Sequence, residues 1–155
     1  MSSGDIVKAI DEAPGVGSAD ATTVPIATTT YAQSSPTFGV AFTAPTSGKV
    51  RINFRARCEC KVNSSRVTVS AEVAVGNTIG TGAVVAAGTD DECIETRQDA
   101  GATTTPALTR INAGSYRYVT GLTPGNPYNA YIVHKGFAAS GGTIYSRGIL
   151  VESVA

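Results

Sequence analysis

The stretch that decides the fold is "KVRINFRARCECKV", residues 49–62. Between Lys49 and Lys61, apolar and polar residues alternate without a break. The apolar positions are Val50, Ile52, Phe54, Ala56, Cys58 and Cys60, and the polar positions are Lys49, Arg51, Asn53, Arg55, Arg57, Glu59 and Lys61. Successive side chains of a β-strand point to opposite faces, so the pattern predicts one long strand with a buried face and a basic face.

The same alternation continues on both sides of this stretch. One parity is apolar in "TFGVAFTAP" and in "RVTVSAEVAV", through Phe38, Val40 and Phe42 and through Val67, Val69, Ala71, Val73 and Val75. The "NSS" turn at residues 63–65 predicts that the opening strand and the strand over 66–75 form a long hairpin. Residues 22–32, "TTVPIATTTYA", are typical of a Thr-rich edge strand because they include a proline.

The second half of the chain also favours strands. Residues 76–114 contain short apolar runs separated by Gly, Asp and Thr, which indicate two or three short strands and a surface loop. Further on, the turns "GLTPGNP" and "SGG" separate longer strands, and the apolar run from Ile149 to Val154 suits a central last strand. About eight strands and no useful helix predict an all-β fold, a jelly-roll-like antiparallel β-sandwich.

Residues 1–21 differ from the rest and predict a short extended N-terminal arm before a sandwich domain over 22–155. The arm is acidic, with Asp5, Asp11, Glu12 and Asp20 against Lys8. Ile6, Val7 and Ile10 give it weak amphipathic character before "PGVGSAD" interrupts the pattern. A segment this short does not fold alone, so we expect it to be disordered or docked on something else.

Length and charge limit the classes of function. A chain of 155 residues is expected to form one domain with a real core. Its 12 basic and 12 acidic residues balance, so the chain as a whole has no general attraction for phosphate and no nucleic-acid partner is expected. No run approaches the roughly 20 apolar residues of a membrane span, and residues 1–15 lack the features of a signal peptide. We expect a soluble protein made in a cytoplasm, with no membrane partner.

The three cysteines, Cys58, Cys60 and Cys93, leave three interpretations open. An odd number argues against a disulfide framework, and the apolar parity of the first two favours buried free thiols. A bridge from either of them to Cys93 is the second interpretation. A metal site is the third and weakest, since a structural zinc site needs four ligands and His134 is the only histidine.

Little in the sequence indicates catalysis, and no catalytic, cofactor-binding or metal-binding residue is predicted. His134 lies on the parity opposite Tyr131 and Val133 and has no nucleophile in a recognisable motif beside it, so it is expected at a surface or an interface. The acidic "TDDE" at residues 89–92 fits a solvated turn better than a calcium loop, because its spacing matches no EF-hand.

The basic parity of the opening strand has three explanations. Nucleic-acid binding is disfavoured because that parity carries no aromatic residue for base stacking and the net charge is zero. An ordinary solvated face and an electrostatic contact with another subunit or a shell remain equal alternatives. For the second of these, the candidate interface residues are Arg51, Arg55 and Arg57.

Tyrosines gather late in the chain, at Tyr116, Tyr118, Tyr128, Tyr131 and Tyr145. Their rings border a β core or a subunit contact, or they stack on sugar rings. For the second alternative, the candidate glycan contacts are Tyr128 and Tyr131 in "GNPYNAY".

Several motifs of residues 22–155 resemble those of a protein family. These are "T-x-x-Y" before the first long strand, "AP-T-SG-K-V" leading into the opening stretch, "GLTPG" after an aromatic strand, and "SGG-T" before a closing "R-x-I-L-V-E" strand. In this layout the chain resembles the small β-sandwich domains of virion proteins of tailed phages that infect actinobacteria. In that family such domains are minor tail modules or capsid decoration proteins, often trimeric jelly rolls like those of the complement globular head or tumour necrosis factor.

The resemblance implies a non-enzymatic phage structural protein. A module that follows only a short arm favours a capsid decoration protein, a homotrimer on the capsid exterior that binds the major capsid protein and stabilises the shell. The arm residues Ile6, Val7, Ile10 and Asp11 are the expected capsid contacts. The alternative is a minor tail or fibre module that binds a host cell-surface glycan.

Overall fold

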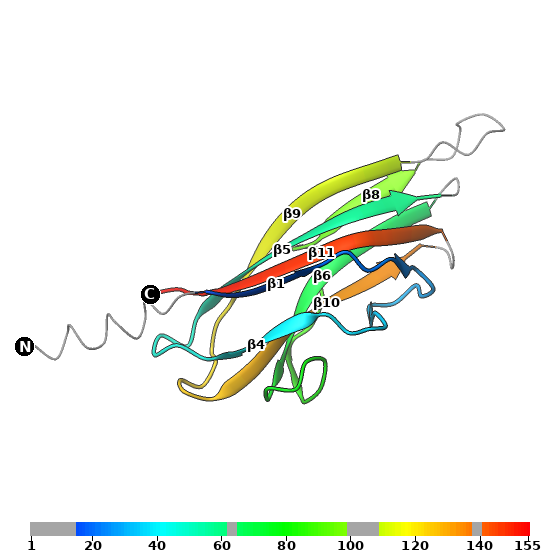
Figure 1. Ribbon diagram of the computed structural model, residues 1–155. Coiled ribbons are helices and arrows are strands. Elements are labelled where there is room, and N and C mark those ends of the chain that lie inside the picture. Colours follow the sequence, from blue (N-terminus) through cyan, green and yellow to red (C-terminus); the bar gives the residue numbers. More distant parts are fainter. Residues whose placement is uncertain (1–14, 62–64, 99–108, 138–140) are drawn as a thin grey trace, which may run out of the picture.

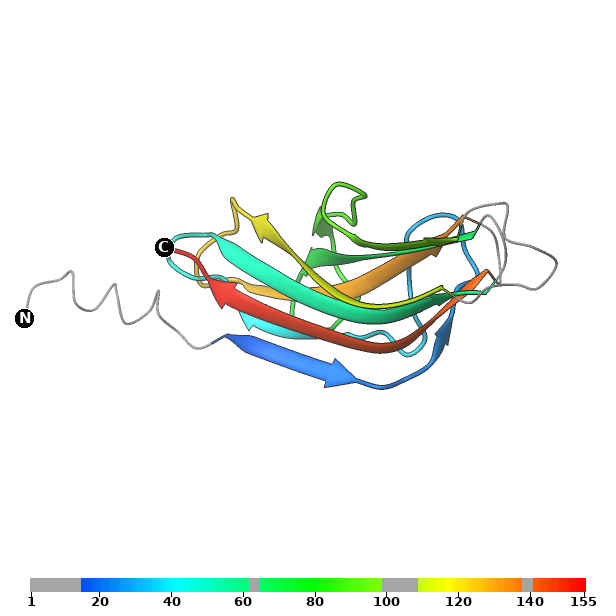
Figure 2. The ribbon, with the colours of Figure 1, turned by 90° about the horizontal axis from the view of Figure 1, so that it is seen from above.

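The computed structural model describes residues 15–61, 65–98, 109–137 and 141–155. They form two antiparallel sheets stacked face to face, and within these ranges there is no helix (Figures 1 and 2). The strands are β1 (Val16–Asp20), β2 (Val24–Pro25), β3 (Ala32–Gln33), β4 (Gly39–Thr43), β5 (Val50–Cys60), β6 (Ser65–Val75), β7 (Val84–Ala86), β8 (Ile94–Gln98), β9 (Thr109–Val119), β10 (Pro127–Gly136) and β11 (Gly142–Ser153). The prediction of an all-β antiparallel sandwich is confirmed.

Each sheet has its own strand order, which brings together strands that are distant in the sequence. Sheet A has the order β1-β11-β5-β9, and β2 also pairs with β11. Sheet B has the order β3-β10-β6-β7, with β4 on β10 and β8 on β6. The last strand, β11, lies between β1 and β5, so the expected central position of the closing strand is confirmed. No helix among the described residues is long and apolar enough to span a bilayer.

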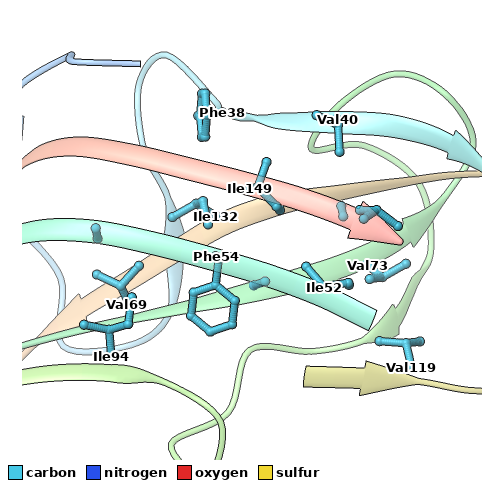
Figure 3. Close-up of a cluster of buried hydrophobic side chains, with 14 of the residues drawn as sticks. Phe38, Val40, Ile52, Phe54, Val69, Val73, Ile94, Val119, Ile132 and Ile149 are labelled. Carbon is cyan, nitrogen blue, oxygen red and sulfur yellow. The ribbon is translucent and has the colours of Figure 1, made fainter. Parts of the chain in front are cut away.

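The opening stretch becomes β5, the central strand of sheet A, and its apolar parity faces the space between the sheets. All six apolar side chains of that parity are at most 2% exposed. Opposite them lie the inward residues of β6 and β10, among them Val69, Val73 and Ile132 (Figure 3). Burying these branched and aromatic side chains on both inner faces is the main source of stability for a sandwich of this kind.

The predicted hairpin between the opening strand and residues 66–75 is wrong. β5 pairs with β11 and β9 in sheet A, whereas β6 pairs with β10, β7 and β8 in sheet B. Alternation shows which face of a strand is buried but not which strand lies beside it. The two strands face each other across the core, and Val75, at the end of β6, is 42% exposed instead of buried.

Residues 22–32 also depart from the prediction. They do not form one strand, and only β2 and the first residue of β3 fall within them. Pro25 has no N–H to donate, so the strand pairing with β11 is limited to Val24 and Pro25. The Ile26 N–H still donates to the Gly142 carbonyl (3.0 Å), and Val24 and Ile26 bury their side chains. Short segments of this kind explain why eleven strands are found where about eight were predicted.

The predicted boundary between arm and sandwich lies too late in the chain. Residues Val16–Asp20 form β1, which pairs along β11 from Val151 to Arg147. The sequence before Thr22 lacks clear alternation and so carries no signal of this strand. The sandwich therefore begins by residue 16, and the arm candidates Ile6, Val7, Ile10 and Asp11 lie outside the described residues.

Two buried arginines of sheet A, one near each edge of the sheet, bond to residues outside their own strands. Arg147 on β11 is 1% exposed; its guanidinium pairs with Asp20 of β1 (Nη2–Oδ2 2.5 Å, Nε–Oδ1 3.1 Å) and donates to Ser34 Oγ, between β3 and β4. On the other edge, Arg117 of β9 donates from Nη1 to the carbonyls of Ala71 (2.7 Å) and Ala87 (2.8 Å) in sheet B. Each arginine thus links an edge of sheet A to sheet B.

Replacing Asp20 by alanine is expected to destabilise the fold by about 3–5 kcal/mol, because it leaves the buried charge of Arg147 without its partner. Urea unfolding measures the loss. Asp91, an exposed carboxylate in the 89–92 turn, serves as the control, and Asp91→Ala is expected to change the free energy of unfolding by less than about 0.5 kcal/mol. Equal effects of the two substitutions would contradict the structural role of Asp20.

Candidate functional site

The outer face of sheet B is covered by the chain itself. Tyr131 and Val133 of β10 point away from the core, yet both are 2% exposed because they pack with Tyr31 and Ile79. The Tyr131 hydroxyl donates to Glu72 Oε1 (2.5 Å), and Tyr31 donates to Asp90 Oδ1 (2.7 Å). Burial and these hydrogen bonds raise the pKa of both tyrosines. Over much of its length this face is therefore occupied.

The outer face of sheet A is open. We define the sheet A outer face as the outward side chains of β5, β9 and β11 between Arg51 and Arg57 and the residues paired with them. Three large apolar or aromatic side chains stand exposed there: Tyr116 (57%), Tyr118 (52%) and Leu150 (37%). The two tyrosine rings meet edge to face, 5.7 Å apart. An exposed cluster of this kind is typical of a binding surface.

A shallow groove of about 610 Å³ crosses this face. Gly17, Gly114 and Gly148 contribute no side chains to it, while Asn53, Arg55, Tyr116 and Leu150 line it. We call this the sheet A groove. Gly148 leaves room for the Arg55 side chain, because a Cβ at that position would lie 2.6 Å from Arg55 Nε and would displace the arginine. The glycine lets the Arg55 side chain lie flat across β11.

The charges of the face are paired at its ends and unpaired in the middle. Arg51 forms an ion pair with Glu152 (2.8 Å), which raises the pKa of the guanidinium. At the other end Glu59, which is 2% exposed, accepts from Arg110, and this hydrogen bond lowers the pKa of the carboxyl. Within the described residues, Arg55 has no hydrogen bond or ion pair.

Arg57 lies beside this unpaired arginine on the same face. Its guanidinium lies over the ring of Tyr145, 5.7 Å from the ring centroid. Both arginines are exposed. The sheet A outer face therefore combines exposed aromatic rings with two positive charges that have no acidic partner in the described part of the chain.

The predicted interface residues Arg51, Arg55 and Arg57 all lie on this face, as their shared parity requires. Sequence reasoning missed Tyr116, Tyr118 and Leu150 as part of the same surface. Tyr116 pairs with Asn53, and Leu150 pairs with Asn53 from the other side. The signal that was missing is the strand order of sheet A, which places β9 and β11 on either side of β5.

The predicted glycan contacts are wrong as exposed stacking surfaces. Tyr128 is 5% exposed and Tyr131 is 2% exposed, so neither ring is free to stack on a sugar. Tyr128 packs against Phe42, and its hydroxyl accepts from the Thr123 N–H (3.1 Å). Both rings therefore border the core, which is the other of the two roles that the sequence allows for them.

His134 was expected at a surface or an interface, and this is also wrong. It points into the sandwich with Ala130 and Ile132, and it is 4% exposed. Its Nδ1 has no hydrogen-bond partner among the described residues. Burial, reinforced by the positive charge of Arg147, lowers the pKa of the imidazole. The parity assignment failed because both parities of β10 are buried, one in the core and one beneath the cover of sheet B.

The cysteines follow the favoured interpretation. All three are free, and Cys58 and Cys60 are fully buried on the inner face of β5. Burial raises the pKa of the Cys58 thiol to about 12, so it stays protonated. Cys93 lies in a turn where its Sγ donates to the Asp90 carbonyl. Across the described ranges, no group of three or more His, Cys, Asp or Glu side chains could hold a metal ion.

Comparisons with known proteins give likenesses of fold only. No family model matches the chain, and neither does any curated protein. Similar solved structures include latent PorU from Porphyromonas gingivalis (8% identity, TM-score 0.36), the C-terminal CBM6 of LamC, a marine laminarinase from Zobellia galactanivorans (10%, 0.32), and infectious bursal disease virus strain Gx (12%, 0.35). The matches cover 89%, 87% and 91% of this chain, and 13%, 98% and 37% of the respective structures.

The buried imidazole makes stability depend on pH. The folded state binds a proton at His134 less readily than the unfolded chain does. Above the unfolded pKa of about 6.5 the imidazole is neutral in both states, and the full stability of the fold is present. As pH falls from there towards the lower folded pKa, the unfolded chain gains the proton first and the free energy of unfolding decreases. Between pH 6.5 and 5 we expect a loss of up to about 1.4 kcal/mol per pH unit. Urea unfolding at several pH values checks this, and His134→Gln is expected to flatten the slope. An unchanged slope would contradict this assignment.

Proposed function

We propose that this chain is a non-enzymatic structural protein of a phage particle, which decorates the outside of the capsid as a homotrimer and stabilises the shell. The observation that carries the proposal is the open sheet A outer face, with Tyr116, Tyr118 and Leu150 beside the unpaired Arg55. Sheet B covers its outer face around Tyr131 and Val133, whereas the sheet A outer face leaves aromatic rings exposed beside the unpaired Arg55. The resemblance of the sequence to phage virion proteins is the reason for proposing a phage particle.

The chemistry of this face suits a protein surface of the shell. Tyrosine and arginine are the residues that most often dominate protein interfaces, because they combine large contact area with directional hydrogen bonds. An unpaired guanidinium beside apolar rings favours an acidic and apolar partner patch. Contacts made only on the assembled shell would stabilise the particle by mass action, since they bind the folded shell and not its separated subunits.

The N-terminal arm provides the second contact with the shell in this proposal. It continues from β1, which is paired along β11 and fastened through Asp20 and Arg147. A strand fixed by a buried ion pair is a firm attachment point for a segment that carries load. The expected shell contacts, Ile6, Val7, Ile10 and Asp11, precede this attachment.

Deleting residues 1–14 is expected to leave the sandwich folded and to abolish binding to undecorated shells, because β1 and Asp20 remain in place. Co-sedimentation with shells measures binding, and urea unfolding of the same sample confirms the fold. Deletion of residues 1–20 is not equivalent, since it removes the partner of Arg147. Undiminished shell binding by the shorter deletion would refute the role of the arm.

Reversing charge on the open face tests the other contact. The double variant Arg55→Glu/Arg57→Glu is expected to weaken shell binding by about 100-fold, because like charges across an interface cost several kcal/mol. Lys49→Glu is the matched control, since it reverses an exposed charge just before β5, outside the sheet A groove. Equal binding by the double variant and the control would mean that the face is ordinary solvated surface. Native mass spectrometry of the wild-type chain tests the trimer.

A further inference from the structure

The sheet A groove has the charge and apolar character to hold a segment of this same chain. Its walls combine Tyr116 and Leu150 with the unpaired guanidinium of Arg55. A partner for such a groove needs apolar side chains close to carboxylates. Residues 5–12, "DIVKAIDE", provide Ile6, Val7, Ala9 and Ile10 together with Asp5, Asp11 and Glu12.

The place where the described chain begins brings this segment to the groove. Gly15 lies against Leu150 and Glu152, where an added Cβ would be about 3.0 Å from Leu150 Cδ1. Gly17, two residues later, already lines the groove. The first described residue, Gly15, therefore lies at the rim of the groove. Pro14 and Gly15 form a dipeptide that favours a turn, so the chain has a position at which to reverse direction.

The length of the segment is sufficient. The groove crosses from β1 over β11 and β5 to β9, which is three strand spacings or about 14 Å. Eight extended residues, 5–12, span about 26–29 Å. A segment held by so short a connection has an effective concentration in the millimolar range, so a contact with a dissociation constant below about 1 mM would be mostly occupied.

We propose that in the free protein residues 5–12 fold back over the sheet A groove of their own chain, with Asp11 and Glu12 directed to Arg55 and Arg57 and the isoleucines towards Tyr116 and Leu150. The segment covers the exposed apolar surface and neutralises its charge. This contact belongs to the free chain, so it does not depend on the proposed role on a capsid.

Hydroxyl-radical footprinting of the full chain at low protein concentration tests the proposal. Phe137, which is 68% exposed and distant from the groove in sequence, provides the reference rate. In the wild-type chain Tyr116 is expected to react several-fold more slowly than its 57% exposure would give. Both Asp11→Lys/Glu12→Lys and Arg55→Glu/Arg57→Glu are expected to raise its rate several-fold.

Combining the two double variants gives the decisive result, because the charges are then exchanged and the contact is possible again. The combined variant is expected to restore slow labelling of Tyr116. As a matched control, Asp91→Lys reverses an acidic residue elsewhere and is expected to change nothing. The proposal is overturned if Tyr116 reacts at its full exposed rate in the wild-type chain, or if charge reversal leaves the rate unchanged. Protection that grows with protein concentration would also overturn it, because a second copy would then be covering the groove.

Discussion

The ion pair between Arg147 and Asp20 is the interaction on which the rest of the arrangement depends. It fixes β1 along β11 and, through Ser34, ties that edge of sheet A to sheet B. A guanidinium buried in a sandwich core is tolerated only when nearly all of its donors are satisfied. Arg147 meets this condition with a carboxylate, a hydroxyl and the face of the Phe38 ring, whose centroid lies 4.8 Å away. With β1 in place, sheet A is wide enough to carry the groove.

The two faces of the sandwich differ in what covers them. On sheet B the segment between β6 and β8 folds back, and Gly88 brings it close enough to touch Val133 and Tyr31. The Asp90 carboxylate then bonds both Tyr31 and Lys135, and these hydrogen bonds lower the pKa of the carboxyl. Sheet A has no comparable covering segment among the described residues. This asymmetry is the physical reason to look for a partner on one face and not the other.

Local sequence patterns predicted the parts of this structure that depend on a single strand. The alternation from Lys49 to Lys61 correctly assigned the buried face of β5, including both cysteines, and the shared parity of Arg51, Arg55 and Arg57. The same reasoning failed wherever the result depended on neighbouring strands. It could not show that β6 lies in the other sheet, that His134 faces the core, or that Tyr116 and Leu150 flank Asn53. Those facts follow from strand order, which depends on contacts between distant segments.

The central proposal is that the sheet A outer face binds a protein surface of the shell. Hydroxyl-radical footprinting of the shell-bound protein tests it most directly. The account predicts that on the shell Tyr116 and Tyr118 both react more slowly than they do in the free protein, while Phe137 keeps its free-protein rate. The claim would be contradicted if both rings, Tyr116 and Tyr118, reacted on the shell at the rates expected for exposure to solvent.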